Sequence, residues 1–244
     1  MHHLVLERWS RGTSPLHRRD PRAKIGALLV LLVAVATAQR ALPVYSAALL
    51  ITLAAGLAWA RIPLGSAVAR AAMVLPFTGV FALISWLAGD PARAASFLLK
   101  SYLSALAVLL VVATTPLPAL LRGMEGLGVP RFLLAVSQFL YRYLFVISGE
   151  AQHMRHASAA RGASARHWIG TGLRFRAAAG ALAVLFGRAY GRAENVHRAM
   201  LARGFQGRVE SLRRPRFRTA DAVFLAAASL LPILLRVAAE RVAG

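Results

Sequence analysis

Five apolar stretches constrain the fold of this chain more than any other feature. They cover residues 23–38, 42–60, 67–88, 94–114 and 220–237, and 58% of the 244 residues are hydrophobic. A helix needs roughly 20 mostly apolar residues to cross a bilayer. The first stretch is short, and we expect the basic side chains of Arg22 and Lys24 to extend its reach by snorkelling. The sequence therefore predicts an all-α, polytopic membrane protein with about five transmembrane helices and a region of coupling helices outside the membrane.

Positive charge is concentrated in two regions of the chain. The formal net charge is +21, from 30 Lys and Arg residues against 9 Asp and Glu residues, and 17 arginines lie between residues 116 and 219. A soluble protein this basic would suggest a nucleic-acid partner. Beside membrane spans, the charge instead indicates topology and attraction to anionic lipid in the bilayer. We expect no nucleic-acid partner, and we expect the N-terminus and the 116–219 region to face the cytoplasm.

This pattern divides the chain into four segments. Residues 1–24 form a cytoplasmic N-terminal arm, 25–115 a four-span membrane portion, 116–219 the cytoplasmic coupling helices, and 220–244 a final transmembrane helix. Within the third segment, residues 131–160 have one long helical pattern, and residues 188–203 have another. The uncharged stretch 177–187 is too short to span a membrane, so we expect it to lie along the membrane surface or against the other helices. Pro76 should kink the third span.

Residues that carry chemistry are sparse. No Gly-rich phosphate loop, Ser-His-Asp set or carboxylate pair stands out, so we expect neither an enzyme nor a bound cofactor. The chain has no cysteine. His2-His3 and His153-x-x-His156 have chelating spacing, but no carboxylate or thiol completes either set, which favours solvated histidines and no metal site. Lys100 lies inside a span, where an ion pathway is one interpretation and snorkelling the better one.

The tripeptide Ala-Arg-Gly occurs twice in the arginine-rich region. The copies are Ala160-Arg161-Gly162 and Ala202-Arg203-Gly204. Each is typical of a helix end, with a cation in the last turn and a glycine able to adopt the left-handed conformation. Two unrelated helix ends would also explain the repeat. Because both copies follow long polar helices, and arginine suits buried bidentate pairing with a carboxylate, we interpret all six residues as docking elements for two pockets on a dimeric partner.

Several motifs together resemble the T component of energy-coupling factor transporters, of the CbiQ type linked to cobalt and nickel uptake. The similarity covers nearly the whole chain. Besides the two triplets, four stretches carry the similarity. They are residues 14–24 (SPLHRRDPRAK), the stretch from 115 to 130, which begins with TPL and ends with GLGVP, residues 139–145 (FLYRYLF), and residues 194–205.

The resemblance implies a non-enzymatic subunit that couples two ABC-type ATPase subunits to a membrane-embedded S component, which binds the substrate. Arg161 and Arg203 would dock in grooves on the ATPases. Ala160 and Ala202 would permit close approach, and Gly162 and Gly204 would turn the chain. The protein would be a multi-pass component of the bacterial inner membrane, and the transported cobalt or nickel ion would bind to the S component.

Three alternatives stay open from the sequence. A T component that serves a vitamin such as biotin would have much the same sequence features. A self-contained secondary carrier is disfavoured because no carboxylate lies in the interior of a span. A membrane-embedded enzyme would need a catalytic set of residues that the sequence does not display.

Overall fold

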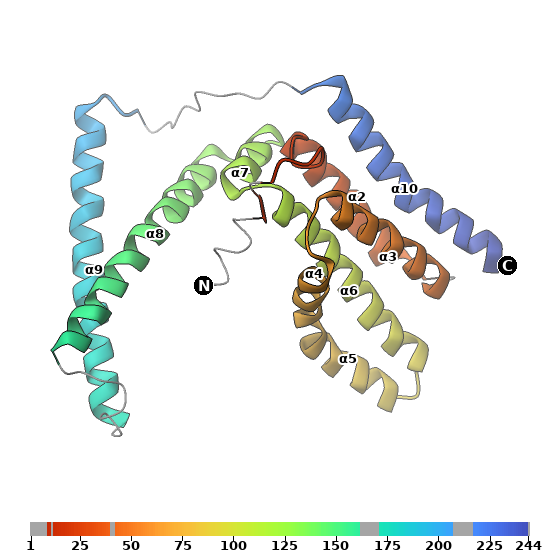
Figure 1. Cartoon of the computed structure of the whole chain (residues 1–244), viewed down its shortest axis with the longest axis horizontal. Helices are drawn as coiled ribbons and strands as arrows, with labels where there is room; N and C mark the ends of the chain where they lie inside the picture. The colour runs from red at the N-terminus through yellow and green to blue at the C-terminus, as the bar shows by residue number, and fades with distance from the viewer. Residues whose placement is uncertain (1–8, 11, 40–41, 162–170, 207–216, 244) are drawn as a thin grey trace. The chain divides into compact units, whose positions relative to one another are not determined.

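The computed structural model of this chain describes residues 9–10, 12–39, 42–161, 171–206 and 217–243, without the side chains of residues 171–174, 242 and 243. Within these residues the chain is almost entirely helical and has no strand (Figure 1). The helices are α2 (Pro21–Thr37), α3 (Leu42–Trp59), α4 (Leu64–Ala71), the short 3₁₀ turn η1 (Ala72–Val74), α5 (Leu75–Leu87), α6 (Pro91–Thr114), α7 (Leu117–Gly126), α8 (Arg131–Ala160), α9 (Thr171–Ala202) and α10 (Thr219–Ala243). The predicted all-α class is confirmed.

The chain folds into two compact units. Unit 1 consists of Met1–Val129 and Arg213–Gly244, and unit 2 consists of Pro130–Leu212. Unit 1 therefore holds α2 to α7 and α10, and unit 2 holds α8 and α9. The sequence pattern began the coupling region at residue 116, whereas the second compact unit begins at Pro130. The reason is that α7 packs on α2 and thereby joins unit 1.

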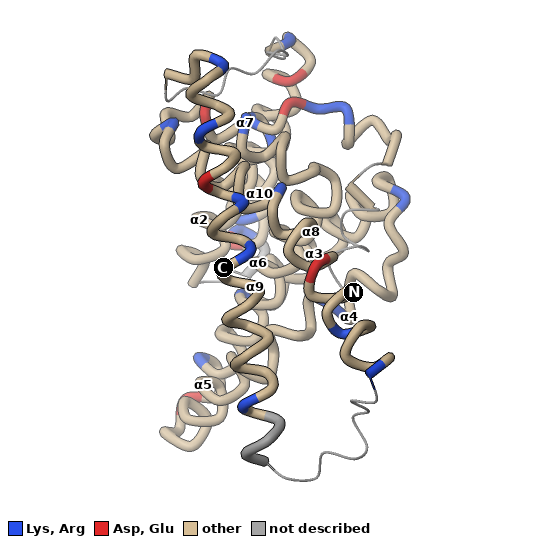
Figure 2. Tube along the Cα trace, turned by 90° about the vertical axis from the view of Figure 1, so that its left-hand side faces the viewer, with Lys and Arg blue, Asp and Glu red and all other residues tan. Residues whose placement is uncertain are grey.

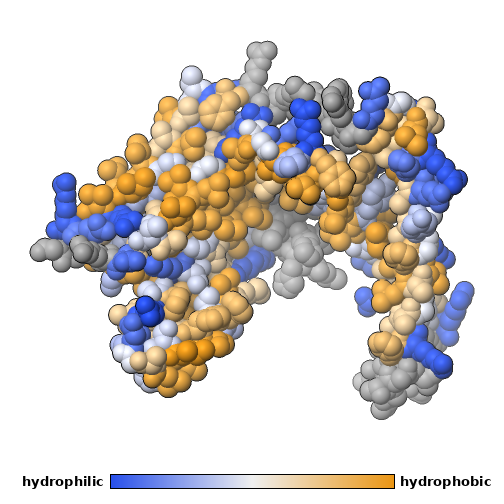
Figure 3. Space-filling model, turned by 180° about the vertical axis from the view of Figure 1, so that it is seen from behind, coloured by the Kyte–Doolittle hydropathy of each residue, from blue (hydrophilic) through white to orange (hydrophobic). Residues whose placement is uncertain are grey.

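The core of unit 1 forms around α6, which contacts α2, α3, α4 and α5, while α10 packs on α2 and α3. Tyr45, Leu49, Leu57, Leu103 and Leu106 are each at most 2% exposed. Other large apolar side chains of this unit face outward, and Figure 3 shows broad hydrophobic areas on its surface. A buried core beneath an apolar exterior is what a helical bundle in lipid requires.

Five described helical segments are long and apolar enough to cross a membrane. They are Leu42–Trp59, Leu64–Leu87, Pro91–Thr114, Arg131–Ala160 and Thr219–Arg241. Their number agrees with the prediction, but the set contains α8 and leaves out α2. With 17 residues, α2 is about 26 Å long, slightly less than the thickness of about 30 Å of a hydrocarbon core. It nevertheless packs along α6 and α10, so it is part of the membrane bundle.

Two local expectations for unit 1 have different outcomes. The kink expected at Pro76 is present as an interruption, because η1 separates α4 from α5 and Pro76 occupies the first turn of α5. The expected snorkelling of Lys24 is wrong. Its side chain is 3% exposed, and its Nζ donates to Thr114 O and Thr115 Oγ1 inside the bundle.

Candidate partner-docking site

The described residues of both Ala-Arg-Gly triplets lie at the C-terminal ends of the two described helices of unit 2. The long helix predicted for residues 131–160 is confirmed, since α8 covers Arg131–Ala160. Residues 177–187, which we expected to lie along the membrane surface or against the other helices, are not separate from residues 188–203, because both belong to the continuous helix α9. Alanine, leucine and arginine favour a helix whether or not the segment carries charge. Unit 2 therefore presents two long helices, each followed by a triplet.

The second triplet closes α9 with a Schellman motif. Gly204 has φ +79°, in the left-handed region that glycine enters without strain. Its amide donates to Leu201 O at 2.9 Å, and the amide of Phe205 donates to Met200 O at 3.0 Å. These two bonds satisfy carbonyls that have no partner within the helix. The sequence-based interpretation of Arg203-Gly204 as a helix end is confirmed in its geometry.

The first triplet begins at the last residue of α8, Ala160. The amide of Arg161 donates to Ala157 O and Ser158 O, both at 3.2 Å, so Arg161 still belongs to the final turn. Gly162 lies outside the described residues. Ala160 and Arg161 are exposed, as are Ala202, Arg203 and Gly204.

The helices α8 and α9 contact each other near their midpoints. Glu150 of α8 forms an ion pair with Arg188 of α9. Beside this pair, α8 and α9 line a groove of about 810 Å³, with Ile147 on one side and Gly187 and Gly191 on the other. A Cβ added to either glycine would meet no atom within 4 Å. The groove is therefore open, and the ion pair forms a polar link between the two helices beside it.

The crossing holds the two triplets apart. Figure 1 shows α8 and α9 running in opposite directions along much of their length, with their C-terminal ends at opposite ends of the pair. From Glu150, α8 continues for about 16 Å to Arg161, and from Arg188, α9 continues for about 22 Å to Arg203. The two arginines cannot enter one pocket. The arrangement suits two separate binding sites.

Positive charge on unit 2 exceeds what its own carboxylates can neutralise. Among its described residues the carboxylates are Glu150 and Glu194, which pair with Arg188 and Arg198 respectively. Figure 2 shows how far basic positions outnumber acidic ones along the trace. Within the described part of the chain, no hydrogen bond or ion pair engages the guanidinium group of Arg161 or Arg203. Both arginines are exposed at a helix end, where an acidic partner can reach them.

The remaining candidates are the two histidine pairs. His153 and His156 are exposed, and His2 and His3 lie outside the described residues. No group of three His, Cys, Asp or Glu residues that could hold a metal ion occurs among the residues that the structure describes.

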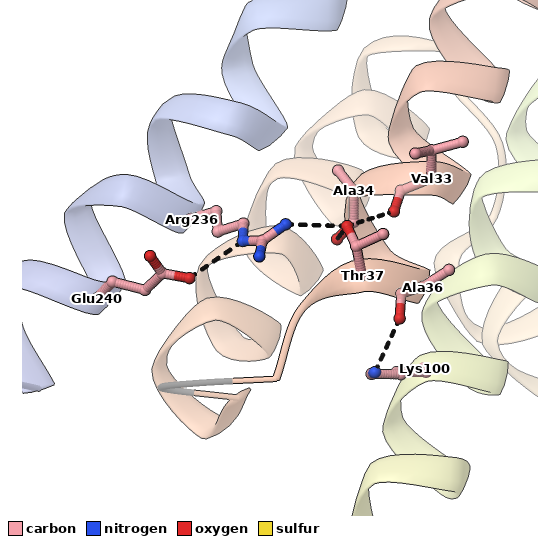
Figure 4. A network of polar contacts seen from close by, with 7 residues as sticks. All are labelled: Val33, Ala34, Ala36, Thr37, Lys100, Arg236 and Glu240. Carbon is pink, nitrogen blue, oxygen red and sulfur yellow. Dashed lines mark hydrogen bonds and ion pairs between the residues drawn. The ribbon is translucent and has the colours of Figure 1, made fainter.

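Lys100 has a structural partner at the C-terminal end of α2. Its Nζ donates to Ala36 O at 3.0 Å at the end of α2 (Figure 4). The sequence analysis missed Arg236 at the same place, where its NH1 donates to Thr37 Oγ1 at 2.9 Å and its Nε lies 3.1 Å from Glu240 Oε1. A cation in the last third of α10 was the available signal. Both cations cap a helix end, where carbonyl dipoles favour positive charge.

Comparison with known proteins covers both triplets. The family model described as cobalt transport protein (CbiQ) matches residues 12–214. The cobalt transport protein CbiQ of Rhodobacter capsulatus is 31% identical over 165 residues, which cover 63% of this chain and 65% of that protein. An uncharacterized protein of Methanocaldococcus jannaschii, MJ1571, is 25% identical over 126 residues, which cover 52% of this chain and 42% of that protein. This chain thus matches less than two thirds of the length of either relative.

Proposed function

Because this chain belongs to the cobalt transport protein (CbiQ) family, we propose that it is the T component of an energy-coupling factor importer. It is a multi-pass membrane protein: four of the five described segments that are long and apolar enough to cross a bilayer belong to unit 1, and the fifth, α8, belongs to unit 2, which this proposal places outside the membrane. As a T component it is a non-enzymatic subunit, which couples two ABC-type ATPase subunits to a membrane-embedded S component. Its N-terminus and unit 2 lie on the cytoplasmic side, where the excess of arginine favours them.

One observation carries this proposal: two exposed arginines end two long helices that cross at an ion pair. Arg161 and Arg203 have no acidic partner within the described chain. A carboxylate in a groove on an ATPase can bind each guanidinium bidentately, which fixes direction as well as distance. Since the two helix ends are far apart, they suit the two ATPase subunits of a dimer, one end on each.

Coupling then follows from the stiffness of the two helices. When ATP binding closes the ATPase pair, the two docked helix ends move with their grooves. A helix transmits such a displacement along its length because every backbone hydrogen bond lies within it. The movement of α8 and α9 is passed to the membrane helices and to the S component. The transported species is a cobalt or nickel ion bound to the S component, and a vitamin such as biotin is the alternative substrate.

Charge reversal at the docking arginines tests this proposal. The tagged chain is expressed with the genes adjacent to its own, extracted in detergent, and its partners are identified by mass spectrometry. Arg161→Glu and Arg203→Glu are each expected to weaken ATPase binding by about 2–5 kcal/mol, because the partner carboxylate is left buried and repelled. Uptake of radiolabelled Co²⁺ should fall in parallel. The double variant should be little worse than either single variant if the two ends act as one rigid unit.

Arg155→Glu is the matched control, since Arg155 is an exposed arginine of α8 outside the triplet. It should leave ATPase recovery close to that of the unmodified chain. The proposal fails if both triplet reversals leave ATPase recovery and uptake unchanged. A chain that elutes alone and still transports after reconstitution would instead be a secondary carrier.

A further inference from the structure

The segment Asp20-Pro21-Arg22-Ala23-Lys24 has no part in the docking site, yet it contains two deeply buried charged side chains. Asp20 is 6% exposed and Lys24 is 3% exposed. Asp20 Oδ1 accepts a hydrogen bond from the amide of Arg22 at 2.9 Å and caps the start of α2. Buried charged groups are costly unless they are bonded. The contacts of these residues therefore show what the segment holds in place.

Lys24 holds the end of α6. Its Nζ donates to Thr114 O at 3.0 Å and to Thr115 Oγ1 at 2.8 Å, at a helix C-terminus whose carbonyls have no intrahelical partner. Both threonines are buried. Directly after them the chain breaks at Pro116 and forms α7, the last helix before unit 2. Lys24 therefore fixes the junction between α6 and α7.

Arg19 and Asp20 hold the start of α10. The amide of Asp20 donates to Asp221 Oδ1 at 3.1 Å, and Arg19 NH1 donates to Ala220 O at 3.1 Å. Asp221 is 6% exposed, and its Oδ2 accepts a hydrogen bond from the amide of Arg218 at 3.1 Å. Because α10 is the first helix after unit 2, the same end of α2 also fixes the point at which the chain returns to the bundle.

Helix α7 lies against this end of α2 as well. A Cβ added to Gly123 would lie 2.9 Å from Pro21 Cβ and 3.1 Å from Ile25 Cδ1. A Cβ added to Gly126 would overlap the side chain of Arg22. Glycine at these two positions is what allows α7 to approach α2 so closely.

The C-terminal end of α2 has similar hydrogen bonds, but it is not the end that contacts α7 and the start of α10. There Lys100 Nζ donates to Ala36 O and Arg236 NH1 donates to Thr37 Oγ1, which ties α2 to α6 and α10 (Figure 4). Neither of the two places where the chain passes from one unit to the other lies at this end of α2. Lys24 and Lys100 can thus be compared, because each donates from Nζ to a C-terminal helix carbonyl at 3.0 Å. Lys24 is buried and lies at the end of α2 that contacts α7 and the start of α10, whereas Lys100 is more exposed and lies at the other end.

We propose that the α2 anchor, formed by Asp20, Lys24, Thr114, Thr115 and Asp221, is the element through which movement of unit 2 reaches the membrane helices. The proposal rests on the coupling function proposed above. Since α7, the helix before unit 2, packs on α2, and the start of α10, the helix after unit 2, is bonded to the residues at the same end of α2, a displacement of α8 and α9 acts on α2, α6 and α10 together. Lys24 is a positioning residue in this scheme, because its side chain contacts neither an ATPase nor a substrate.

Lys24→Met and Lys100→Met, each in the full complex reconstituted in proteoliposomes, separate coupling from assembly. The readouts are the ATPase recovered with the chain, ATP hydrolysis, and the amount of radiolabelled Co²⁺ taken up per ATP hydrolysed. Lys24→Met should retain the ATPase and lower uptake per ATP by about 2- to 30-fold, the range typical of substitutions that alter coupling between sites. Lys100→Met should keep the ratio of the unmodified complex.

Equal ratios for Lys24→Met and the unmodified complex would overturn the anchor role, and so would an equal loss with Lys100→Met. Failure of the unmodified chain to recover any ATPase would instead refute the coupling function itself.

Gly123→Ala keeps the test decisive if Lys24→Met does not accumulate in the membrane. The added methyl group pushes α7 away from Pro21 without burying a polar group. Gly79→Ala in α5 is its control, because a Cβ there meets no atom within 4 Å. Uptake per ATP should fall for Gly123→Ala and stay constant for Gly79→Ala. Unchanged coupling in Gly123→Ala would contradict the proposal.

Discussion

Unit 1 buries a continuous apolar core around α6, whereas among the described side chains of unit 2 only that of Leu134 is buried. Large apolar side chains of α9, such as Leu182 and Phe186, are 65% and 72% exposed. Figure 3 shows hydrophilic and hydrophobic patches alternating on the surface of unit 2. The two units thus differ in how much surface they bury: the helices of unit 1 pack against one another, whereas most of the described surface of α8 and α9 is exposed and can contact other molecules.

The cations of the two units differ in the same way. In unit 1, Lys24, Lys100 and Arg236 donate hydrogen bonds to the ends of neighbouring helices and hold the bundle together. In unit 2, Arg161 and Arg203 are exposed at helix ends. A cation that caps a buried helix end contributes to the fold, whereas an exposed one at the tip of a stiff helix is suited to a partner. This difference explains how so basic a chain can place some of its cations inside a membrane bundle.

The largest expected difference between the two units is in the free energy of unfolding lost when a leucine is truncated to alanine in each. Leu57 is 0% exposed, and Leu57→Ala should lower the free energy of unfolding by about 1–3 kcal/mol, mainly through the cavity term, since lipid is as apolar as the core. Leu182→Ala removes the same atoms from an exposed site and should change stability by less than about 0.5 kcal/mol. Thermal unfolding of the purified protein in detergent measures both. Similar losses would mean that α9 is packed as tightly as the core of unit 1.

A smaller and more local effect is expected at the end of α9. Gly204→Ala forces a side chain into the left-handed region and should destabilise the last turn by about 1 kcal/mol. Gly191→Ala is the control, because it lies within the helix and a Cβ there meets no atom within 4 Å. It should stabilise α9 by about 0.5–1 kcal/mol. Hydrogen exchange should therefore accelerate near Leu201 in the first variant and slow around residue 191 in the second. Slower exchange near Leu201 in Gly204→Ala would show that the Schellman motif is not needed.

Local patterns in the sequence predicted part of this structure. The bounds of α8 follow from Pro130 and the apolar repeat after it, and the end of α9 follows from Arg203-Gly204. The extent of α9 did not follow, because the uncharged residues 177–187 resembled a separate segment although their helix propensity continues the helix. The first triplet is predicted in full but described only for Ala160 and Arg161.

Contacts between residues far apart in the chain could not be predicted in this way. Lys24 resembled a snorkelling anchor because its partners, Thr114 and Thr115, lie about ninety positions away. The amide of Asp20 meets the side chain of Asp221 across 201 positions. Burial of a charge is decided by tertiary packing, and one sequence contains no local signal for it. The sequence therefore indicated Asp20 and Lys24 of the α2 anchor only as part of the motif at residues 14–24, and it predicted none of their contacts.

The most direct test of the account is to map which part of unit 2 touches the ATPase. The chain has no cysteine, so Ala202→Cys and Ala160→Cys each introduce a single thiol for a short photo-cross-linker at a triplet. Ala178→Cys places the same probe on an exposed site of α9, about 36 Å along the helix from Ala202. The account predicts that both triplet positions cross-link to an ATPase subunit and that position 178 does not. Cross-linking at position 178 with none at either triplet would contradict it.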